Sequence, residues 1–370
     1  MVINFLIIIQ ENGMNEVKKE SISVLHIPEV CAFNEFINRI SDIQIKSSIN
    51  VARLDFCNDE PEMKKCSFSA KDVLSRMSGK RILHFHWPEK LLRNIDIDYF
   101  VDELKTLKAN GVKFVYTVHN LQPHEAMNRE DGIARFYEYF DKNVDGYVVF
   151  SDYQKKVFSG MNPQIAREKI CCIPHPNYVI DDGVQEGKSW HEKLNIPKDK
   201  KIIILLGRVR NYKNFDLFID IARNYKKDDV YFVLAGLPFN EEIRDRIIET
   251  SKGVNNFRYY FDFLSEQDLH ALLSEVRAVA MIYHHPWSTG VGILAGNMKK
   301  PLIGFLPAMF ADYHEKIGFF IEEEMEIDKL IQLIDQMPED NKEGENFYNV
   351  LSLNTDELLG NLYFNFYNNI

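Results

Sequence analysis

The feature that most constrains the fold of this chain is the alternation of short apolar runs with amphipathic segments along most of its length. The runs at 21–27, 81–87, 112–120 and 145–151 are rich in β-branched and aromatic residues, and segments with apolar residues at helical spacing lie between them. Strands that alternate with helices in this way predict parallel βαβ units and a doubly wound α/β sheet.

The alternation is interrupted once and then begins again. Residues 179–200 are polar and rich in turn-forming residues, after which the apolar runs 202–207, 230–236 and 278–284 follow with helices between them. A chain of 370 residues also exceeds what one hydrophobic core usually serves. The sequence therefore predicts an N-terminal Rossmann-like domain at 14–178, a linker at 179–200 and a second Rossmann-like domain at 201–345. The final residues, 346–370, are predicted to form a C-terminal helix that packs back on the first domain.

Composition excludes several classes of function. The formal net charge of −11 argues against nucleic acid as the main partner, because phosphate backbones require a basic surface. Five cysteines show no metal-ligand spacing, and this pattern is typical of reduced thiols in the cytoplasm. The apolar start of the chain is shorter than the ~20 residues that span a bilayer, and it lacks signal-peptide features. We therefore expect a cytoplasmic protein, with 1–13 as an extension before Met14.

The clearest motif is the segment LLGRVRNYKNFD at 205–216. A predicted strand ends at Gly207, and the cations Arg208, Arg210 and Lys213 arrive before the next helix. Arginine binds phosphate oxygens in pairs and lysine acts as a point charge, so this cluster suits a diphosphate. The alternative is a solvated basic loop that pairs with nearby acidic residues.

A second motif, WSTGVGILAG, places small residues at the start of a helix. The amide groups and the dipole at a helix N-terminus attract anions, so this turn is predicted to form a second wall of the diphosphate site. The predicted binding residues are Ser288, Thr289, Gly290 and Val291. By itself such a turn is more often an ordinary Ser/Thr helix cap.

In the first half, two predicted strands end in polar and aromatic residues. The carboxyl ends of parallel strands meet at one edge of a sheet, where ligands bind. Histidine and carboxylate side chains there can act as general acids and bases or hold sugar hydroxyls. The candidates are His86, Trp87, Glu89, His119, Asn120, His124 and Glu125. Because no three of them have a short fixed spacing, we expect no metal site.

Together these motifs resemble the GT-B glycosyltransferases, in particular bacterial relatives of glycosyltransferase family 4. The resemblance runs from about residue 22 to the C-terminus and is strongest at HFHWPE, TVHN, IPHPNY, GRVRNYKNFDLFIDIA, VLAG and STGVGILA. It implies that Arg208 and Lys213, helped by Arg210, hold the donor diphosphate, and that His119 contacts the transferred sugar. Phe263 and Leu264 correspond to the segment that contacts the nucleobase.

The resemblance implies an enzyme that moves a hexose from a UDP- or GDP-sugar to a saccharide or lipid-linked glycan acceptor, in polysaccharide or cell-surface glycan synthesis. No metal or other cofactor is expected, and contact with the inner face of the membrane would be transient. Glu89, His119 and Glu125 are the candidates for a catalytic base. The retaining members carry two glutamates where this chain has Thr289 and Asn297. The anomeric outcome is therefore open, as are the alternatives of a non-catalytic scaffold subunit and of a GT-B epimerase or phosphorylase.

Overall fold

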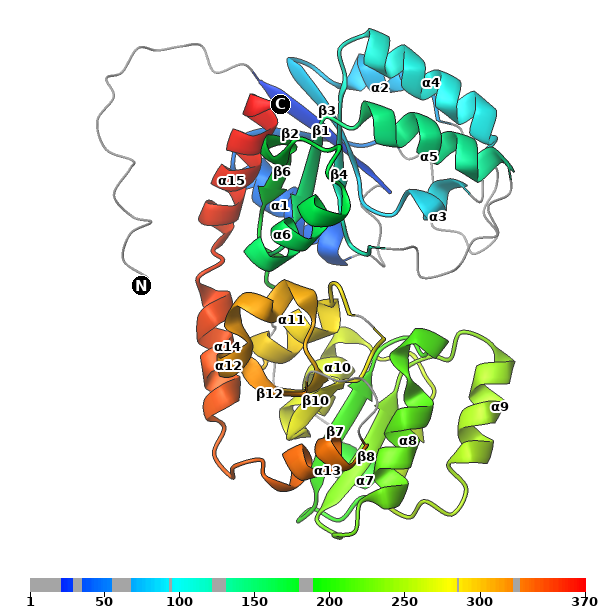
Figure 1. Cartoon of the computed structure of the whole chain (residues 1–370), viewed down its shortest axis with the longest axis vertical. Coiled ribbons are helices and arrows are strands. Elements are labelled where there is room, and N and C mark those ends of the chain that lie inside the picture. Colours follow the sequence, from blue (N-terminus) through cyan, green and yellow to red (C-terminus); the bar gives the residue numbers. More distant parts are fainter. Residues whose placement is uncertain are drawn as a thin grey trace, which may run out of the picture.

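The structure is a computed structural model that describes residues 21–28, 35–54, 68–92, 95–121, 131–179, 189–284, 286–321 and 327–370. Within these ranges the strands form two six-stranded parallel sheets, one in each half of the molecule (Figure 1). The predicted doubly wound α/β fold is confirmed, because helices flank both sheets.

The first sheet has the strand order β2-β1-β3-β4-β5-β6. Its central strands are buried apolar runs, as expected for parallel strands that are covered on both faces. Its strands are β1 (Ile22–Ile27), β2 (Ile49–Ala52), β3 (Lys80–Phe85), β4 (Lys113–Thr117), β5 (Gly146–Val149) and β6 (Ile170–Cys172). The helices between them are α1 (Glu35–Lys46), α2 (Ala70–Arg76), α3 (Pro88–Leu92), α4 (Ile97–Ala109), α5 (Asp131–Asn143), α6 (Asp152–Met161) and the 3-10 turn Arg167–Lys169.

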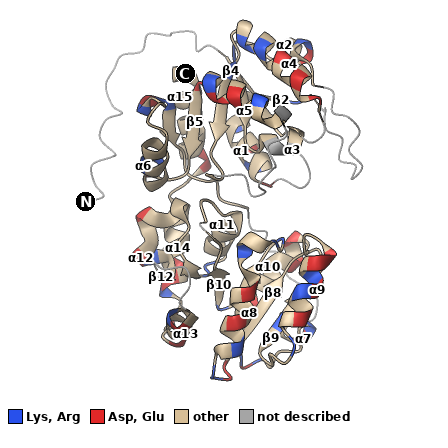
Figure 2. Cartoon of the chain, turned by 45° about the vertical axis from the view of Figure 1, so that its right-hand side comes forward, with Lys and Arg blue, Asp and Glu red and all other residues tan. Residues whose placement is uncertain are grey.

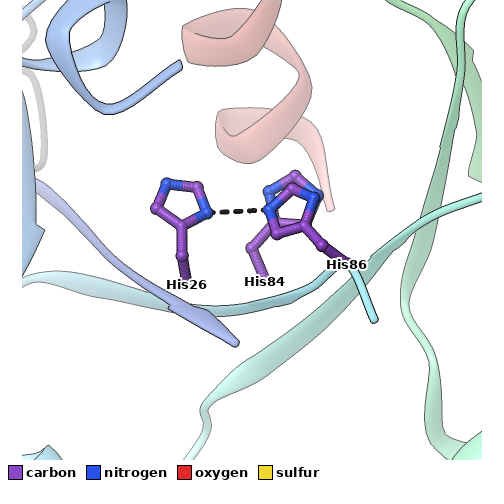
Figure 3. Close-up of side chains that lie close together, drawn as sticks. All are labelled: His26, His84 and His86. Carbon is purple, nitrogen blue, oxygen red and sulfur yellow. Dashed lines mark hydrogen bonds between the residues drawn. The ribbon is translucent and has the colours of Figure 1, made fainter. Parts of the chain in front are cut away.

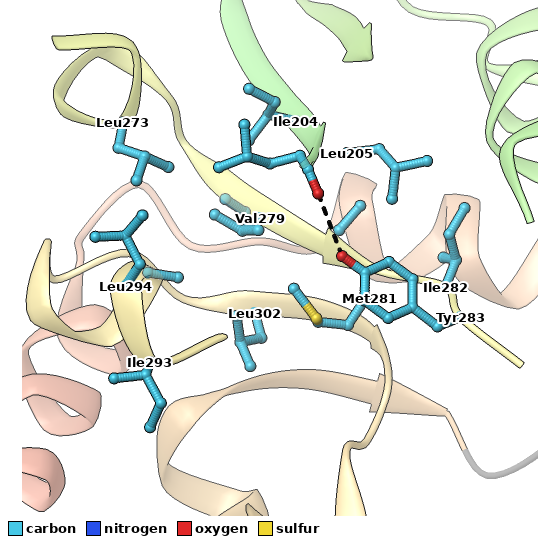
Figure 4. Close-up of a cluster of buried hydrophobic side chains, with 14 of the residues drawn as sticks. Ile204, Leu205, Leu273, Val279, Met281, Ile282, Tyr283, Ile293, Leu294 and Leu302 are labelled. Carbon is cyan, nitrogen blue, oxygen red and sulfur yellow. Dashed lines mark hydrogen bonds between the residues drawn. The ribbon is translucent and has the colours of Figure 1, made fainter. Parts of the chain in front are cut away.

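The second sheet has the order β12-β11-β10-β7-β8-β9. Its strands are β7 (Lys201–Leu206), β8 (Val230–Ala235), β9 (Phe257–Tyr260), β10 (Ala278–Met281), β11 (Leu302–Phe305) and β12 (Gly318–Ile321). Its helices are α7 (Trp190–Lys193), α8 (Phe215–Asn224), α9 (Glu241–Thr250), α10 (Glu266–Glu275), α11 (Gly290–Asn297), α12 (His314–Ile317) and α13 (Ile327–Asp335), with 3-10 turns at Asn211–Lys213 and Ala308–Tyr313. Figure 4 shows β7, β10 and α11 sharing one buried apolar core.

Local capping fixes where several helices begin. Asp96 accepts a hydrogen bond from the Tyr99 amide at 2.9 Å, so Asp96 rather than Asp98 is the N-cap of α4. Thr289 caps α11 in the same way, since its hydroxyl accepts from the Gly292 amide at 3.1 Å. Both helices therefore begin at a polar residue whose side chain accepts a hydrogen bond from an amide of the first turn.

The last two helices join the two domains. α14 (Lys342–Ser352) packs on α11 and α12 of the second domain, and α15 (Asp356–Asn369) crosses back to pack on α1 of the first, as Figure 1 shows in red. Arg39 on α1 pairs with Asp356 at 2.5 Å, and Lys46 reaches the same carboxylate at 3.0 Å. The C-terminal helix is thus part of the first domain's core.

Candidate functional site

A cavity of about 770 Å³ lies between the two domains, at the carboxyl ends of strands from both sheets. This is the position at which open α/β sheets bind their ligands. The lining residues come from both halves of the chain. They are Glu35, Phe36, Trp87, His119, Asn120, Leu121, Met161, His175, Tyr178, Tyr212, Lys213, Tyr283, His284, Pro286, Trp287, Ser288, Thr289, Gly290 and Val291.

The turn after β7 brings Lys213 into this cavity. Gly207 has φ +95°, and a Cβ there would lie 2.9 Å from the Lys213 ammonium nitrogen, so the backbone must be glycine for the lysine to fit. Lys213 Nζ donates to the Leu206 carbonyl oxygen and lies 3.2 Å from the Tyr283 hydroxyl, whose position Figure 4 shows. Burial, together with the smaller effect of the nearby Arg210 charge, lowers the pKa of Lys213 to about 7. Within the described ranges no carboxylate pairs with Lys213, and such a lysine is suited to an anionic ligand.

The two predicted arginine ligands lie differently from Lys213. The guanidinium carbons of Arg208 and Arg210 lie 5.5 and 4.6 Å from the centre of the Phe239 ring, in the geometry of cation–π contacts. Arg208 is exposed, and neither arginine is among the described residues that line the cavity. The sequence brings all three cations to one turn, but the described structure places only the lysine at the cavity wall.

The start of α11 forms the neighbouring wall. The Thr289 amide contacts the Met309 sulfur at 3.1 Å, and the Thr289 hydroxyl serves as the helix cap. Gly290 and Val291 follow at the cavity surface, where the positive end of the helix dipole lies. A Cβ on Gly290 would lie 2.6 Å from the Tyr178 hydroxyl, so glycine keeps this wall open. Figure 2 shows that α11 carries no charged side chain, in contrast to α8 and α9.

The two positions at which retaining relatives carry glutamate have structural roles in this chain. Thr289 caps α11, as described above. Asn297, at the other end of the helix, accepts a hydrogen bond from the Tyr178 amide at 3.0 Å and donates to the Asn177 side chain at 3.2 Å. These bonds attach the segment after β6 to α11. Neither position supplies a carboxylate to the cavity.

The wall from the first domain is aromatic and is built around His119. The Trp87 ring stacks on the His119 ring with centroids 3.9 Å apart, and Phe36 meets it edge-on at 4.7 Å. His119 is only 4 % exposed and lies directly after β4, as its motif predicted. Asn120 lines the cavity next to it. The first domain therefore presents an imidazole held between aromatic rings, opposite Lys213 and the start of α11.

His86 does not face the cavity, although the sequence predicted that it would. It is 1 % exposed and lies behind His119, with 3.3 Å between His86 Nδ1 and His119 Nε2. Figure 3 shows His86 clustered with His84, which lies on β3 two residues earlier, and with His26 from the neighbouring strand β1. Strand alternation places His84 and His86 on the same face of the sheet, so both side chains point toward the buried α1 and α15 layer.

These three histidines lie close enough together to hold a metal ion, with ligand atoms within 4.8 Å of one another. Their sequence spacing did not reveal this, because His26 comes from a different strand. His26 Nδ1 lies 2.9 Å from His86 Nε2, while His84 is bonded to Tyr367 and Thr117. The cluster is thus part of a hydrogen-bonded network.

Sequence reasoning missed Glu35. It stands in the first turn of α1 and lines the cavity, the one carboxylate among the described lining residues. Burial raises its pKa, and the negative charge of Glu266, from the other domain, adds to the rise. The sequence feature that could have identified Glu35 is its position at the start of α1. This helix follows the carboxyl end of β1, and open α/β sheets bind their ligands at that edge.

The remaining predicted residues lie elsewhere. The side chain of Glu89 and both His124 and Glu125 fall outside the described residues. Phe263 and Leu264 follow β9, and the described cavity lining does not include them; Phe263 is 65 % exposed.

Comparison with known proteins agrees with this architecture. Residues 187–350 match the family described as glycosyl transferases group 1. A GDP-mannose:glycolipid 4-beta-D-mannosyltransferase of Xanthomonas campestris is 21% identical over 283 residues, which cover 73% of this chain and 74% of that protein.

Among solved structures, the sucrose-phosphate synthase of Thermosynechococcus elongatus superposes with a TM-score of 0.65 at 14% identity, covering 94% of this chain and 98% of that one. Anabaena HepE in complex with UDP-glucose gives 0.64 at 13% identity, with 93% and 98% covered. An E. coli structure described as trehalose-6-phosphate bound with UDP-2-fluoro glucose gives 0.70 at 9% identity, with 95% and 99% covered. These likenesses concern the fold.

Within the described residues, none of the helices is both long and apolar enough to cross a membrane. The family match covers the domain that carries Lys213 and the start of α11, and the structural likeness extends over both domains. The second domain therefore matches the group 1 glycosyl transferases over residues 187–350, and the chain as a whole has the GT-B fold.

Proposed function

We propose that this glycosyltransferase moves a hexose from a nucleoside diphosphate sugar to a hydroxyl of a saccharide or lipid-linked glycan. The observation that supports this proposal is the arrangement of the cavity walls. Lys213 and the start of α11 meet at one wall, and His119 lies on the wall that the first domain supplies. A donor bound across this cavity would have its diphosphate at the first wall and its sugar near the second.

The donor site is suited to the leaving group. Burial of its charge lowers the pKa of Lys213 to about 7. A diphosphate would restore that charge, and the α11 dipole would add to the attraction. Positive groups fixed where negative charge develops stabilise the transition state, so we propose that the reaction needs no metal ion.

The acceptor side offers two groups that can take a proton, Glu35 and His119. In the proposed step the acceptor oxygen forms a bond to the anomeric carbon while the bond from that carbon to the phosphate oxygen breaks. The hydroxyl proton passes to one of these groups, and the nucleoside diphosphate leaves. The raised pKa of Glu35 favours it as a base, since a base works best with a pKa near the working pH.

The acceptor class is inferred from relatives. The Xanthomonas relatives are named as glycolipid mannosyltransferases, which supports a lipid-linked acceptor and a GDP-sugar donor, while the Anabaena structure holds UDP-glucose. We propose a role in polysaccharide or cell-surface glycan synthesis, with the protein in the cytoplasm and in transient contact with the membrane that carries its acceptor.

The first test is a thermal-shift titration with UDP, GDP, CMP and ADP, without and then with Mg²⁺. A ligand at 100 times its Kd stabilises the native state by about 2.7 kcal/mol. We expect one diphosphate to raise Tm without metal, and Lys213→Met to reduce the shift strongly.

Lys300→Met is the matched control. The pKa of Lys300 is also lowered by burial, but its ammonium group donates to the Ser274 carbonyl and is not part of the cavity lining. Its variant should keep the full shift. If no nucleotide raises Tm in the wild-type protein, the donor site is wrong, and a scaffold subunit becomes the better account.

A further inference from the structure

A continuous chain of buried polar side chains leads from the cavity to the C-terminal helix. His119 Nε2 lies 3.3 Å from His86 Nδ1, and His86 Nε2 lies 2.9 Å from His26 Nδ1 (Figure 3). His26 Nε2 then lies 2.8 Å from the Gln44 carbonyl oxygen. The network runs from His119, just after β4, and His86, just after β3, to β1 and then to α1, which is the next described element after β1 in sequence.

The C-terminal helix completes the chain. The Gln44 amide nitrogen donates to the Tyr367 hydroxyl at 3.0 Å, and that hydroxyl lies 2.6 Å from His84 Nδ1. His84 Nε2 in turn lies 2.8 Å from the Thr117 hydroxyl. Tyr367 is fully buried. A residue at the end of the chain thus contacts both branches of the network beneath His119.

The donors and acceptors define a direction. The Gln44 oxygen can only accept, so His26 carries its proton on Nε2 and its Nδ1 is an acceptor. His86 must then donate from Nε2 to His26 and accept at Nδ1, which makes His119 the donor from its own Nε2. On the other branch, Tyr367 accepts from Gln44 and donates to His84.

We propose that this network makes Tyr367 and Gln44 positioning residues, which hold neutral His119 as the Nε2–H tautomer with Nδ1 as the proton-accepting nitrogen. The proposal rests on the proposed function, because it assigns His119 the nitrogen with which it would meet a sugar or acceptor hydroxyl. The hydrogen bond that one nitrogen of an imidazole makes determines which nitrogen can act as a base.

Burial keeps His26 and His84 neutral at pH 7. It lowers the pKa of His26 to about 4, against a smaller opposing effect of the Gln44 hydrogen bond, and it lowers the pKa of His84 well below its usual value. Neutral imidazoles each have one donor and one acceptor nitrogen, so the chain can be satisfied only if all its members share one direction. A substitution of Tyr367 should therefore alter the hydrogen bonding of His119.

The test is long-range ¹H–¹⁵N NMR of the full-length protein at pH 7, which reports the tautomer of each histidine. Single His→Gln variants assign the signals of His26, His84, His86 and His119. We expect all four to be neutral Nε2–H tautomers. An Nδ1–H tautomer at His26, His86 or His119 would overturn the proposed direction, and stoichiometric Zn²⁺ that shifts the signals of His26, His84 and His86 would replace the network with a metal site.

Tyr367→Phe tests the coupling. The variant removes one oxygen, which should change the ¹⁵N signals of His84, His26 and His119 and lower kcat about tenfold, while the KM for the donor stays within about twofold. Tyr363→Phe is the matched control, because Tyr363 lies one turn earlier in α15, is equally buried, and its hydroxyl has no hydrogen-bond partner among the described residues. It should leave the histidine signals and kcat unchanged.

The two proposals fail in different ways. If Tyr367→Phe leaves the His119 signal and kcat as in the wild type, the positioning role is wrong even though nucleotides still raise Tm. If instead the tautomers are as expected but no nucleotide binds, the direction of the network is confirmed as a structural feature. The proposed transferase site is then wrong.

Discussion

The Ser288 hydroxyl donates a hydrogen bond of 2.6 Å to the main-chain carbonyl of His119, and so connects the second domain to the first at the cavity. Beside it, the Trp287 indole nitrogen donates to the Val118 carbonyl at 2.8 Å. Two successive residues before α11 thus hold two successive residues after β4. The wall that would bind phosphate and the wall that carries the imidazole are fixed relative to each other by these bonds.

We expect Ser288→Ala to lower kcat/KM by about three- to tenfold, because one hydrogen bond of ~0.5–1.5 kcal/mol that aligns the two walls is lost. Steady-state kinetics with the donor found by thermal shift will measure it. Ser352→Ala is the control, since that hydroxyl bonds only locally to the Asn349 carbonyl on α14. Equal activity of the two variants would show that the cross-domain bond does not align the site.

The lowered pKa of Lys213 predicts a pH-dependent donor affinity. In the empty site the lysine loses its proton as the pH rises through about 7, whereas a bound diphosphate favours the charged form. Binding above pH 7 must therefore take up a proton, and Kd should rise by up to about tenfold for each pH unit. Calorimetry between pH 6 and 9, in buffers of different ionisation enthalpy, will show the uptake.

Lys213→Met should bind weakly and show no such proton uptake over the same pH range. A wild-type Kd that stays constant from pH 6 to 9 would contradict the role of Lys213 as the titrating group.

We expect a side chain at residue 290 to clash with the Tyr178 hydroxyl group. A Cβ at residue 290 would lie 2.6 Å from that oxygen but 3.6 Å from the ring carbon that bears it. We expect Gly290→Ala to cost about 1–3 kcal/mol of unfolding free energy and to weaken nucleotide binding. Adding Tyr178→Phe should restore most of both losses, as a double-mutant cycle will measure. Losses that simply add would show that the two residues do not meet.

Buried neutral histidines predict a loss of stability in acid. Burial lowers the pKa of His26 and of His175 from 6.5 to about 4, so between these values the unfolded chain binds protons that the folded protein does not. This contribution to the unfolding free energy is fully present above pH 6.5 and is lost as the pH falls to about 4. It is on the order of 3 kcal/mol for each residue.

Chemical denaturation between pH 4 and 7 will measure this slope. His175→Asn cannot take up the proton and should flatten the slope relative to the wild type, whereas His314→Asn, at an exposed position, should leave it unchanged. An unchanged slope in His175→Asn would contradict the assignment.

Much of the architecture could be predicted because it depends on patterns of residues that are close together in the sequence. The runs that became β7 and β8 are continuous and apolar, which is what parallel strands covered on both faces require. The cap at Asp96 and the small-residue turn before α11 are short-range features, and each formed where its motif stands. His119 and Lys213 lie at strand ends, so topology alone brings them to the ligand-binding edge.

The orientation of individual side chains depended on the tertiary structure. Arg208, Arg210 and Lys213 share one motif, yet only Lys213 lines the described cavity, because Gly207 leaves room for its ammonium group while Phe239 draws the arginines to its ring. No sequence pattern distinguishes these outcomes.

The same holds for the residues that sequence reasoning missed or misplaced. Glu35 is one polar residue at the start of an amphipathic helix, and its carboxylate matters only because the second domain closes the cavity opposite it. His86 follows its strand as expected, but it bonds to His26, and the network continues from His26 through Gln44 to Tyr367, in segments far from His86 in sequence. The sequence alone determined the two sheets and the edge at which they meet a ligand. Only the packing of α1 and α15 against the first sheet decided which histidine reaches the cavity, because burial and hydrogen bonding there depend on contacts between residues far apart in the chain.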